Sequence, residues 1–317
     1  MQNQAMEAAE GSEGRGALEG MARPEAPSPR AACGGAAGEG KSVLLISDLA
    51  GYGKVALAAM IPVLSAMRLN VYNLPTALVS NTLDYGKFDI LETTGYMRNA
   101  LAVWDELGFR FDAVFAGFLF SDEQSRLVAD YCRRSRDEGL PVFVDPIMGD
   151  WGSLYNGVTE ANVAHARKLC AVADVIMPNM TEAQFLCDRF TGQRSVTGAQ
   201  AEALVEGLRD LGARNVVVTS MAVEGQPCTL VCEEGSTAPA LLPYDELPVQ
   251  MPGTGDIFSS VLIGHQMNGY GLVESVQAAM DTVVRLLERC LEVPDRFKGV
   301  PIELHLDEVR LAARAGA

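Results

Sequence analysis

The sequence of 317 residues is short of histidine, tryptophan and basic charge: it has three histidines, two tryptophans and 25 basic residues against 41 acidic ones. His165, His265 and His305 are scattered over helical patterns and the C-terminal end, so a histidine-based catalytic triad or metal site is not expected. The formal net charge of −16 argues against nucleic acid or an anionic membrane as a partner, because both bind basic surfaces. No apolar run approaches the roughly 20 residues of a membrane-spanning helix.

Cysteine is present, but not in a pattern that holds a metal or a disulfide framework. The seven cysteines are an odd number, and no two of them have C-x-x-C spacing. This usage fits reduced thiols better than disulfides or a zinc site, and it predicts a cytoplasmic protein.

Composition divides the chain into two regions. Residues 1–40 are rich in Ala, Gly, Glu and Pro and show no hydrophobic periodicity, so we interpret them as a disordered N-terminal extension. Residues 41–317 contain neither an internal repeat nor a linker, which predicts one domain. The apolar fraction of 48% is ample for its core.

From residue 41 onward, short apolar runs alternate with amphipathic helical patterns. The predicted strands are 43–47, 71–78, 113–117, 142–145, 174–177 and 216–219. The predicted helices are 55–67, 90–107, 122–138, 160–172, 180–190, 197–211, 254–268 and 272–292. This alternation predicts an α/β fold with a doubly wound, mainly parallel central sheet flanked by helices. After Thr219 the pattern changes to an apolar run at 228–233 and a proline-containing run at 239–252, which indicates a hairpin or a lid-like segment.

The most informative motif is Gly253-Thr254-Gly255-Asp256, which directly precedes a helical pattern. Glycine lets the backbone approach a ligand, and a helix N-terminus presents unpaired N–H groups with a partial positive charge. Such a site favours a phosphate, and the Asp256 carboxylate beside it could take a proton from a hydroxyl. The motif therefore indicates phosphoryl transfer to an alcohol. The alternative is an ordinary helix start with Thr254 or Asp256 as N-cap.

Polar side chains also follow several predicted strands, at the sheet edge where α/β proteins bind ligands. Asp145 ends one strand and Asp150 lies five residues on, and paired carboxylates of this kind suit Mg²⁺ beside phosphates. Turn formation is the alternative for this segment. Asn179 and Glu182 follow the next strand with the spacing of a helix capping box, which also allows both to face a metal–phosphate site.

The first predicted strand leads into a glycine-containing segment, residues 47–54, that lacks the Walker A spacing. Ser47 and Asp48 could hydrogen-bond the polar edge of a small acceptor, or the segment could simply be a turn into a helix. The polar residues that follow the predicted strands fall into two groups, one in the first half of the sequence and one in the second. We therefore predict an acceptor pocket built from the first group and a nucleotide pocket built from the second.

Taken together, these motifs resemble the ribokinase-like superfamily and, within it, the pyridoxal/pyridoxamine (vitamin B6) kinases. The segments that carry the resemblance span residues 42 to about 290: they are 47–54, 80–81 with 85–87, 116–121, 145–150, 179–182, 219–220 and 253–256. Hydroxymethylpyrimidine kinases of the same superfamily usually carry cysteine where Asp256 stands, so this position favours the B6 kinases.

The resemblance implies a role for each matching residue. Asp256 would be the base that deprotonates the 5′-hydroxymethyl group, next to an anion hole of Gly253, Thr254 and Gly255. Mg²⁺ and its waters would be held against the ATP phosphates by Asp145, Asp150, Asn179 and Glu182, with Asp145 and Glu182 as the metal ligands. The other nucleotide contacts would be Tyr155, Thr219 and Ser220, and the acceptor contacts would be Ser47, Asp48, Asn81 and Phe118.

The resemblance further implies a homodimer and a monovalent cation such as K⁺. Two departures concern the pockets: Thr82 and Leu83 replace the usual His-Thr pair, and Met177 replaces a common threonine before Pro178. Two alternatives therefore stay open. One is a kinase for hydroxymethylpyrimidine or another small alcohol, and the other is a non-catalytic B6- or nucleotide-binding regulator.

Overall fold

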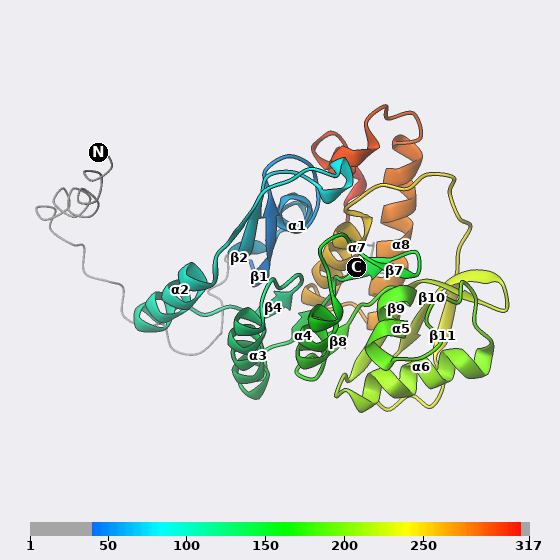
Figure 1. Ribbon diagram of the computed structural model, residues 1–317, viewed down its shortest axis with the longest axis horizontal. Coiled ribbons are helices and arrows are strands. Elements are labelled where there is room, and N and C mark those ends of the chain that lie inside the picture. Colours follow the sequence, from blue (N-terminus) through cyan, green and yellow to red (C-terminus); the bar gives the residue numbers. More distant parts are fainter. Residues whose placement is uncertain (1–39, 312–317) are drawn as a thin grey trace, which may run out of the picture.

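The computed structural model describes residues 40–311, which form a central sheet between two layers of helices (Figure 1). The predicted N-terminal extension, apart from Gly40, lies outside the described residues. The predicted α/β class is confirmed, because six neighbouring strands in the middle of the sheet run parallel.

The main sheet has nine strands in the order β11-β10-β9-β8-β5-β4-β1-β2-β3. Its strands are β1 (Ser42–Ala50), β2 (Asn70–Val79), β3 (Ile90–Glu92), β4 (Ala113–Ala116), β5 (Val142–Val144), β8 (Val175–Ile176), β9 (Asn215–Val223), β10 (Gln226–Cys232) and β11 (Ala240–Pro243). β3 at one edge of the sheet, and β10 and β11 at the other side, are antiparallel to their neighbours. A separate small hairpin pairs β6 (Gly149–Asp150) with β7 (Ser153–Leu154).

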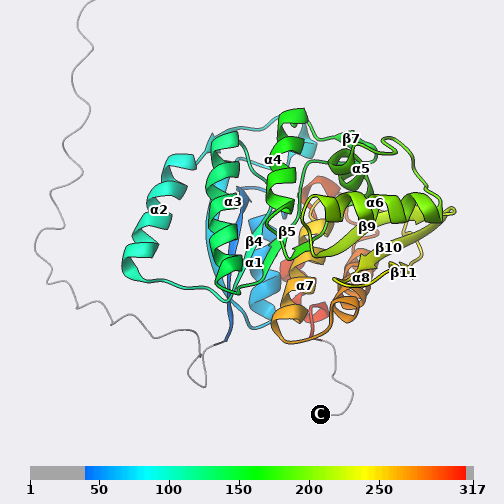
Figure 2. The same ribbon diagram turned by 90° about the horizontal axis from the view of Figure 1, so that it is seen from below.

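Helices cover both faces of the sheet (Figure 2). One layer contains α2 (Thr94–Leu107), α3 (Asp122–Asp137), α4 (Glu160–Cys170), α5 (Met180–Cys187) and α6 (Gly198–Asp210). The other contains α1 (Leu57–Ala66), α7 (Thr254–Met267) and α8 (Leu272–Arg289). No helix among residues 40–311 combines the length and apolar character needed to cross a bilayer.

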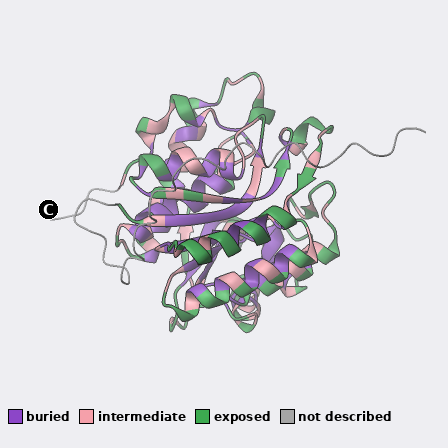
Figure 3. Cartoon of the chain, turned by 90° about the vertical axis from the view of Figure 1, so that its left-hand side faces the viewer, coloured by how far each residue is buried: buried purple, intermediate pink, exposed green. Residues whose placement is uncertain are grey.

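Alternate residues of the central strands serve the two layers, because successive side chains of a strand point to opposite faces. In β1, Leu44 and Ile46 pack with the α2–α6 layer, whereas Val43 and Leu45 pack with the α1, α7 and α8 layer. The strands are therefore apolar on both faces, as their sequences predicted. Figure 3 shows this buried interior between helices whose outer surfaces are exposed.

Several predicted boundaries are wrong. The predicted helix 90–107 begins instead as the edge strand β3, in which Leu91 pairs with Leu78, and α2 starts only at Thr94. Thr219 lies within β9 and not at its end, because β9 continues past the parallel sheet to pair with β10. The hairpin expected after Thr219 is confirmed, because β10 pairs with β11 in antiparallel register. The β6–β7 hairpin was not predicted.

After α8 the chain returns across α1 through three short 3₁₀ helices: η2 (Arg296–Lys298), η3 (Ile302–Leu304) and η4 (Leu306–Glu308). Val300 and Ile302 are fully buried in the core beneath α1 and α8. This path of residues 296–308 was also not predicted, and it brings residues 297–299 to the loops that follow β1 and β2.

At the sheet edge where the parallel strands begin, Asp174 holds three elements together. Its carboxylate accepts the N–H of Val142 at 3.0 Å and pairs with Arg136 at 3.3 Å and Arg214 at 3.1 Å. We predict that Asp174→Ala lowers the free energy of unfolding by about 1–3 kcal/mol, because it leaves a largely buried amide without its acceptor. Urea denaturation measures this, with the exposed Asp137→Ala as control. Equal losses in the two variants would contradict the role of Asp174.

Candidate active site

The N-terminus of α7 is shaped by two glycines with different surroundings. Gly253 has φ +85°, and a Cβ there would collide with the carbonyl oxygen of Lys54, so only glycine fits. Gly255 is exposed, and a Cβ there would point into open space. The first-turn N–H groups of a helix have no intrahelical acceptor. This end of α7 is therefore free to receive an anion.

Asp256 follows these glycines in the first turn of α7 and is 9% exposed. Its Oδ2 accepts the backbone N–H of Ala56 at 2.8 Å. Burial raises the pKa of Asp256 to about 8; the Ala56 hydrogen bond lowers this pKa, and the charges of Asp145 and Asp48 raise it. The carboxyl group is thus held in place with a pKa suited to exchanging a proton near neutral pH.

Asp145 lies just beyond β5, and its charge acts on both Asp256 and Glu182; we call these three buried residues the carboxylate cluster. Its Oδ2 accepts the hydroxyl of Ser259 at 2.8 Å, and Ser259 is on α7, three residues after Asp256. Burial raises the pKa of Asp145 to about 7, and its hydrogen bond from Ser259 lowers it. Asp145 and Asp256 therefore reach the same space from β5 and from α7.

Glu182 and Asn179 form the predicted capping box of α5. The Glu182 carboxylate accepts backbone N–H groups from Asn179 at 2.8 Å, Met148 at 3.0 Å and Gly149 at 3.5 Å. Asn179 in turn donates its side-chain N–H to the Gly149 carbonyl at 2.8 Å. Burial and the nearby Asp145 charge raise the pKa of Glu182 well above its ordinary value. The capping box therefore also fixes the loop after β5 beside the carboxylate cluster.

The remaining residues predicted for the nucleotide lie around this loop. Asp150 accepts the Trp151 N–H at 2.7 Å, and burial raises the pKa of its carboxyl. Burial raises the pKa of the Tyr155 phenol, and the charges of Glu182 and other carboxylates add to this. Thr219 forms a parallel bridge with Asn179, and the exposed Ser220 after it has φ +51°. These residues therefore lie between β5 and α4 and on the part of β9 that is bridged to Asn179.

Among the predicted acceptor residues, Ser47 and Asp48 lie within β1, because this strand continues to Ala50 beyond its predicted end at residue 47, whereas Asn81 and Phe118 follow β2 and β4. Ser47 is fully buried, and its hydroxyl accepts the Phe118 N–H at 3.3 Å and lies 3.5 Å from Asp48 Oδ1. Burial raises the pKa of Asp48 to about 6. The Asn81 side chain donates to the carbonyls of Thr82 at 3.0 Å and Lys87 at 2.9 Å, so it shapes the loop after β2.

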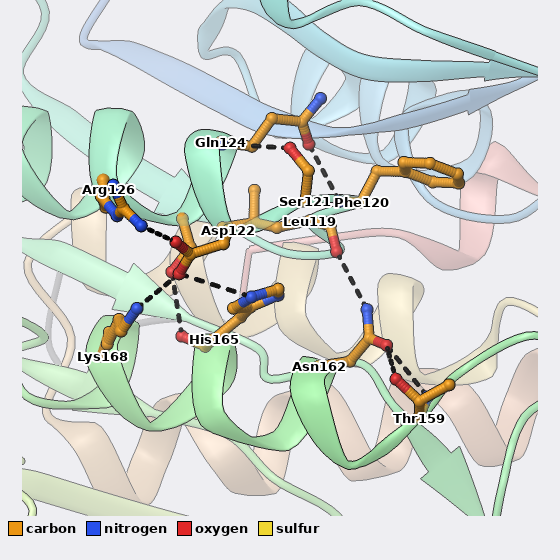
Figure 4. Close-up of polar contacts among 11 residues, drawn as sticks. Leu119, Phe120, Ser121, Asp122, Gln124, Arg126, Thr159, Asn162, His165 and Lys168 are labelled. Atoms are coloured by element: carbon orange, nitrogen blue, oxygen red, sulfur yellow. Dashed lines mark hydrogen bonds and ion pairs between the residues drawn. The ribbon is translucent and has the colours of Figure 1, made fainter.

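An ion-pair network supports the segment that follows Phe118 (Figure 4). Asp122, at the start of α3, contacts Arg126 on its own helix and Lys168 and His165 on α4. The hydrogen bond from Lys168 lowers the pKa of Asp122, whereas burial lowers the pKa of His165. His165 therefore belongs to a contact between α3 and α4, in keeping with the surface or packing role expected for a histidine in a helical pattern.

Sequence reasoning missed two groups that contact the carboxylates. Ser259 could have been found, because residues three apart share one face of a helix and Asp256 was already identified. The Ala56 N–H could not, because a backbone donor has no side-chain signature.

Comparison with known proteins fits this geometry. Residues 56–300 match the model of the phosphomethylpyrimidine kinase family. The chain belongs to that family. The chain is 33% identical over 256 residues to a pyridoxine/pyridoxal/pyridoxamine kinase of Bordetella avium. This match covers 77% of this chain and 83% of the relative. The resemblance to ribokinase-like vitamin B6 kinases is thereby confirmed.

Two solved structures share the fold over most of the chain. A phosphomethylpyrimidine kinase-type protein from Bacteroides thetaiotaomicron superimposes with a TM-score of 0.81 and 31% identity, covering 89% of this chain and 98% of that one. A second crystal form of that protein contains pyridoxal. Pyridoxal kinase from Lactobacillus plantarum gives a TM-score of 0.76 and 27% identity, with 85% and 96% coverage.

The raised pKa of Asp145 has a consequence for stability. The folded carboxyl has a pKa of about 7 against an ordinary 3.8, so folding binds a proton between these values and stability falls as pH rises through them. We predict that Asp145→Asn raises Tm by roughly 2–8 °C at pH 8 and by much less at pH 4. Thermal unfolding across this pH range, with Asp137→Asn as control, measures it. Parallel curves for wild type and Asp145→Asn would contradict the assignment.

Proposed function

We propose that the protein is an ATP-dependent pyridoxal kinase that phosphorylates the 5′-hydroxymethyl group of pyridoxal, pyridoxamine or pyridoxine. The observation that carries this proposal is the buried Asp256 carboxyl beside the unpaired amides of α7, a base next to an anion site. Family membership and the relatives named for B6 vitamers support it.

In the proposed reaction, Asp256 accepts the proton of the acceptor hydroxyl as its oxygen attacks the γ-phosphorus of ATP. The bond from the γ-phosphorus to the bridging oxygen breaks, and ADP leaves with that electron pair. The N–H groups of Gly253, Thr254 and Gly255 and the dipole of α7 stabilise the transferring phosphoryl group. The Ala56 N–H orients Asp256 throughout. Ser47, Asp48, Asn81 and Phe118 would position the acceptor ring.

The carboxylate cluster fits Mg²⁺, although no three His, Cys, Asp or Glu side chains within residues 40–311 could hold a metal by themselves. Asp145 would bind it directly. Glu182 already accepts backbone N–H groups on both oxygens, so Glu182, Asn179 and Asp150 would act mainly through water. Phosphate oxygens would complete the shell, and Mg²⁺ would neutralise phosphate charge.

Tyr155, Thr219 and Ser220 would contact the nucleotide. The monovalent cation and the homodimer implied by the resemblance remain predictions. The free cysteines recorded among the described residues support the proposed cytoplasmic location.

Hydroxymethylpyrimidine is the second candidate acceptor, because the matching family is named for phosphomethylpyrimidine kinase. Asp256 favours the B6 vitamers, since the pyrimidine kinases usually carry cysteine there. Side-by-side kcat/KM values on both classes of acceptor separate the two. ATP binding without ADP release on any acceptor would instead indicate a non-catalytic regulator.

The first prediction from this proposal concerns the base. Asp256→Asn keeps the shape of the side chain and an oxygen for the Ala56 N–H, but it cannot take a proton. We expect kcat to fall by roughly 10²–10⁴, while ATP still binds. ADP release measures the rate and equilibrium dialysis measures binding. A folded Asp256→Asn variant with near wild-type kcat would refute the role of Asp256.

A second prediction concerns the metal. Removing divalent cations should abolish phosphorylation of the vitamer, and added Mg²⁺ should restore it. Asp145→Asn should raise the Mg²⁺ concentration at half-maximal rate by about tenfold or more, since one ligand charge is lost. The matched control is Asp137→Asn. An unchanged Mg²⁺ dependence in Asp145→Asn would show that Asp145 is not a ligand.

A further inference from the structure

The segment Asp295–Gly299, which we call the C-terminal strap, crosses the loops that follow β1 and β2. It is held at both ends by the core, since Cys290 before it and Val300 and Ile302 after it are fully buried. The strap itself is mostly exposed. A short exposed segment between two fixed anchors has little freedom to move away from the loops beneath it.

The first half of the strap contacts the loop after β2. The Tyr85 hydroxyl donates to Asp295 Oδ2 at 2.7 Å, and the Thr82 hydroxyl donates to the Phe297 carbonyl at 2.6 Å. The Tyr85 ring also packs edge-on against the Phe297 ring, with centroids 5.4 Å apart, and is tilted against the Tyr52 ring, with centroids 6.0 Å apart. The loop that contains Asn81 is therefore bonded to a segment more than 200 residues further along the chain.

The second half of the strap contacts the two loops around Asp256. The Lys298 carbonyl accepts the Lys54 N–H at 2.7 Å. Gly299 has φ +76°, and a Cβ there would lie 2.7 Å from the Lys54 carbonyl oxygen and 2.8 Å from that of Pro252. Lys54 also pairs with Glu303 just beyond the strap. Gly299 is thus wedged between the loop before α1 and the loop before α7.

Ala56 connects these contacts to the base. It lies two residues after Lys54, has the unfavourable angles φ +48° and ψ −134°, and donates its N–H to Asp256. A non-glycine residue in such a conformation persists only when its surroundings hold it. The strap supplies part of those surroundings through Lys54.

We propose that the C-terminal strap is a positioning element of the kinase site: it holds the Lys54–Ala56 loop that orients Asp256, and it fixes the acceptor loop through Thr82 and Tyr85. This inference rests on the proposed kinase function. It also explains one departure from the B6 kinase pattern. Thr82, which replaces the usual histidine, is 2% exposed and binds the strap. Its hydroxyl therefore acts through the strap and not on the acceptor.

The contact between the second half of the strap and the loops around Asp256 is tested with Gly299→Ala. The added methyl group must displace the Lys54 or Pro252 carbonyl, so we expect kcat to fall at least about tenfold while KM for pyridoxal changes by less than about threefold. Amide hydrogen exchange in residues 54–60 should accelerate. Gly139→Ala is the control, because Gly139 also has positive φ (+84°) but open space around its Cβ position.

The contact between the first half of the strap and the loop after β2 is tested with Thr82→Val and Tyr85→Phe. These substitutions remove the two hydroxyl donors but keep the side-chain shapes. KM for pyridoxal should rise by about 3–10-fold with kcat within about twofold, as expected for the loss of one hydrogen bond that orders the pocket. Thr82→Ser retains the donor and should recover most of the loss.

The outcomes separate the strap from the proposed function. If wild-type protein phosphorylates neither vitamers nor pyrimidines, the kinase proposal fails, and hydrogen exchange in residues 54–60 still tests the strap. Wild-type exchange and wild-type kinetics in folded Gly299→Ala would overturn the strap's role. If Gly299→Ala does not fold, Thr82→Val decides: a KM equal to that of wild type would overturn the inference, and a raised KM that Thr82→Ser recovers would support it.

Discussion

The hydrogen bond from the Ala56 N–H to Asp256 is the interaction on which the site depends. A buried carboxyl is costly to ionise, and Asp145 and Asp48 increase the cost at this place. The hydrogen bond from the Ala56 N–H offsets part of this ionisation cost and also sets the direction of the Asp256 side chain. The position of this N–H requires strained angles at Ala56, so the surrounding loops must be rigid. Much of the architecture around α7 serves this requirement.

The three-layer fold brings the groups together from distant parts of the sequence. Asp145 follows β5 and Asn179 follows β8. Because these strands are parallel, their C-terminal ends lie at the same edge of the sheet, and the two residues lie there too. Helix α7 packs against α1 on the opposite side of the sheet from α3 and α4, and its first turn meets that edge. The residues proposed to contact the acceptor come from β1 and from the segments after β2 and β4, and those proposed to contact the nucleotide come from the chain from Asp145 onward.

Much of this arrangement could be predicted from sequence, and the reasons differ by residue. The strands around Leu44 and Val114 were recognisable because they are apolar on both faces, and the capping box of Asn179 and Glu182 has a fixed spacing. The edge strand β3 was mistaken for helix because its three residues continue an amphipathic pattern. The strap and the Ala56 donor were missed because they depend on backbone contacts between segments far apart in the chain, which leave no local pattern.

The path of the strap affects the order in which the protein becomes competent. Its contacts with Lys54 and Thr82 join residues 297 and 298 to loops more than 200 residues earlier in the chain. During translation these loops cannot be held until the strap has left the ribosome. The surroundings of Asp256 are therefore completed later than the strands that precede the strap.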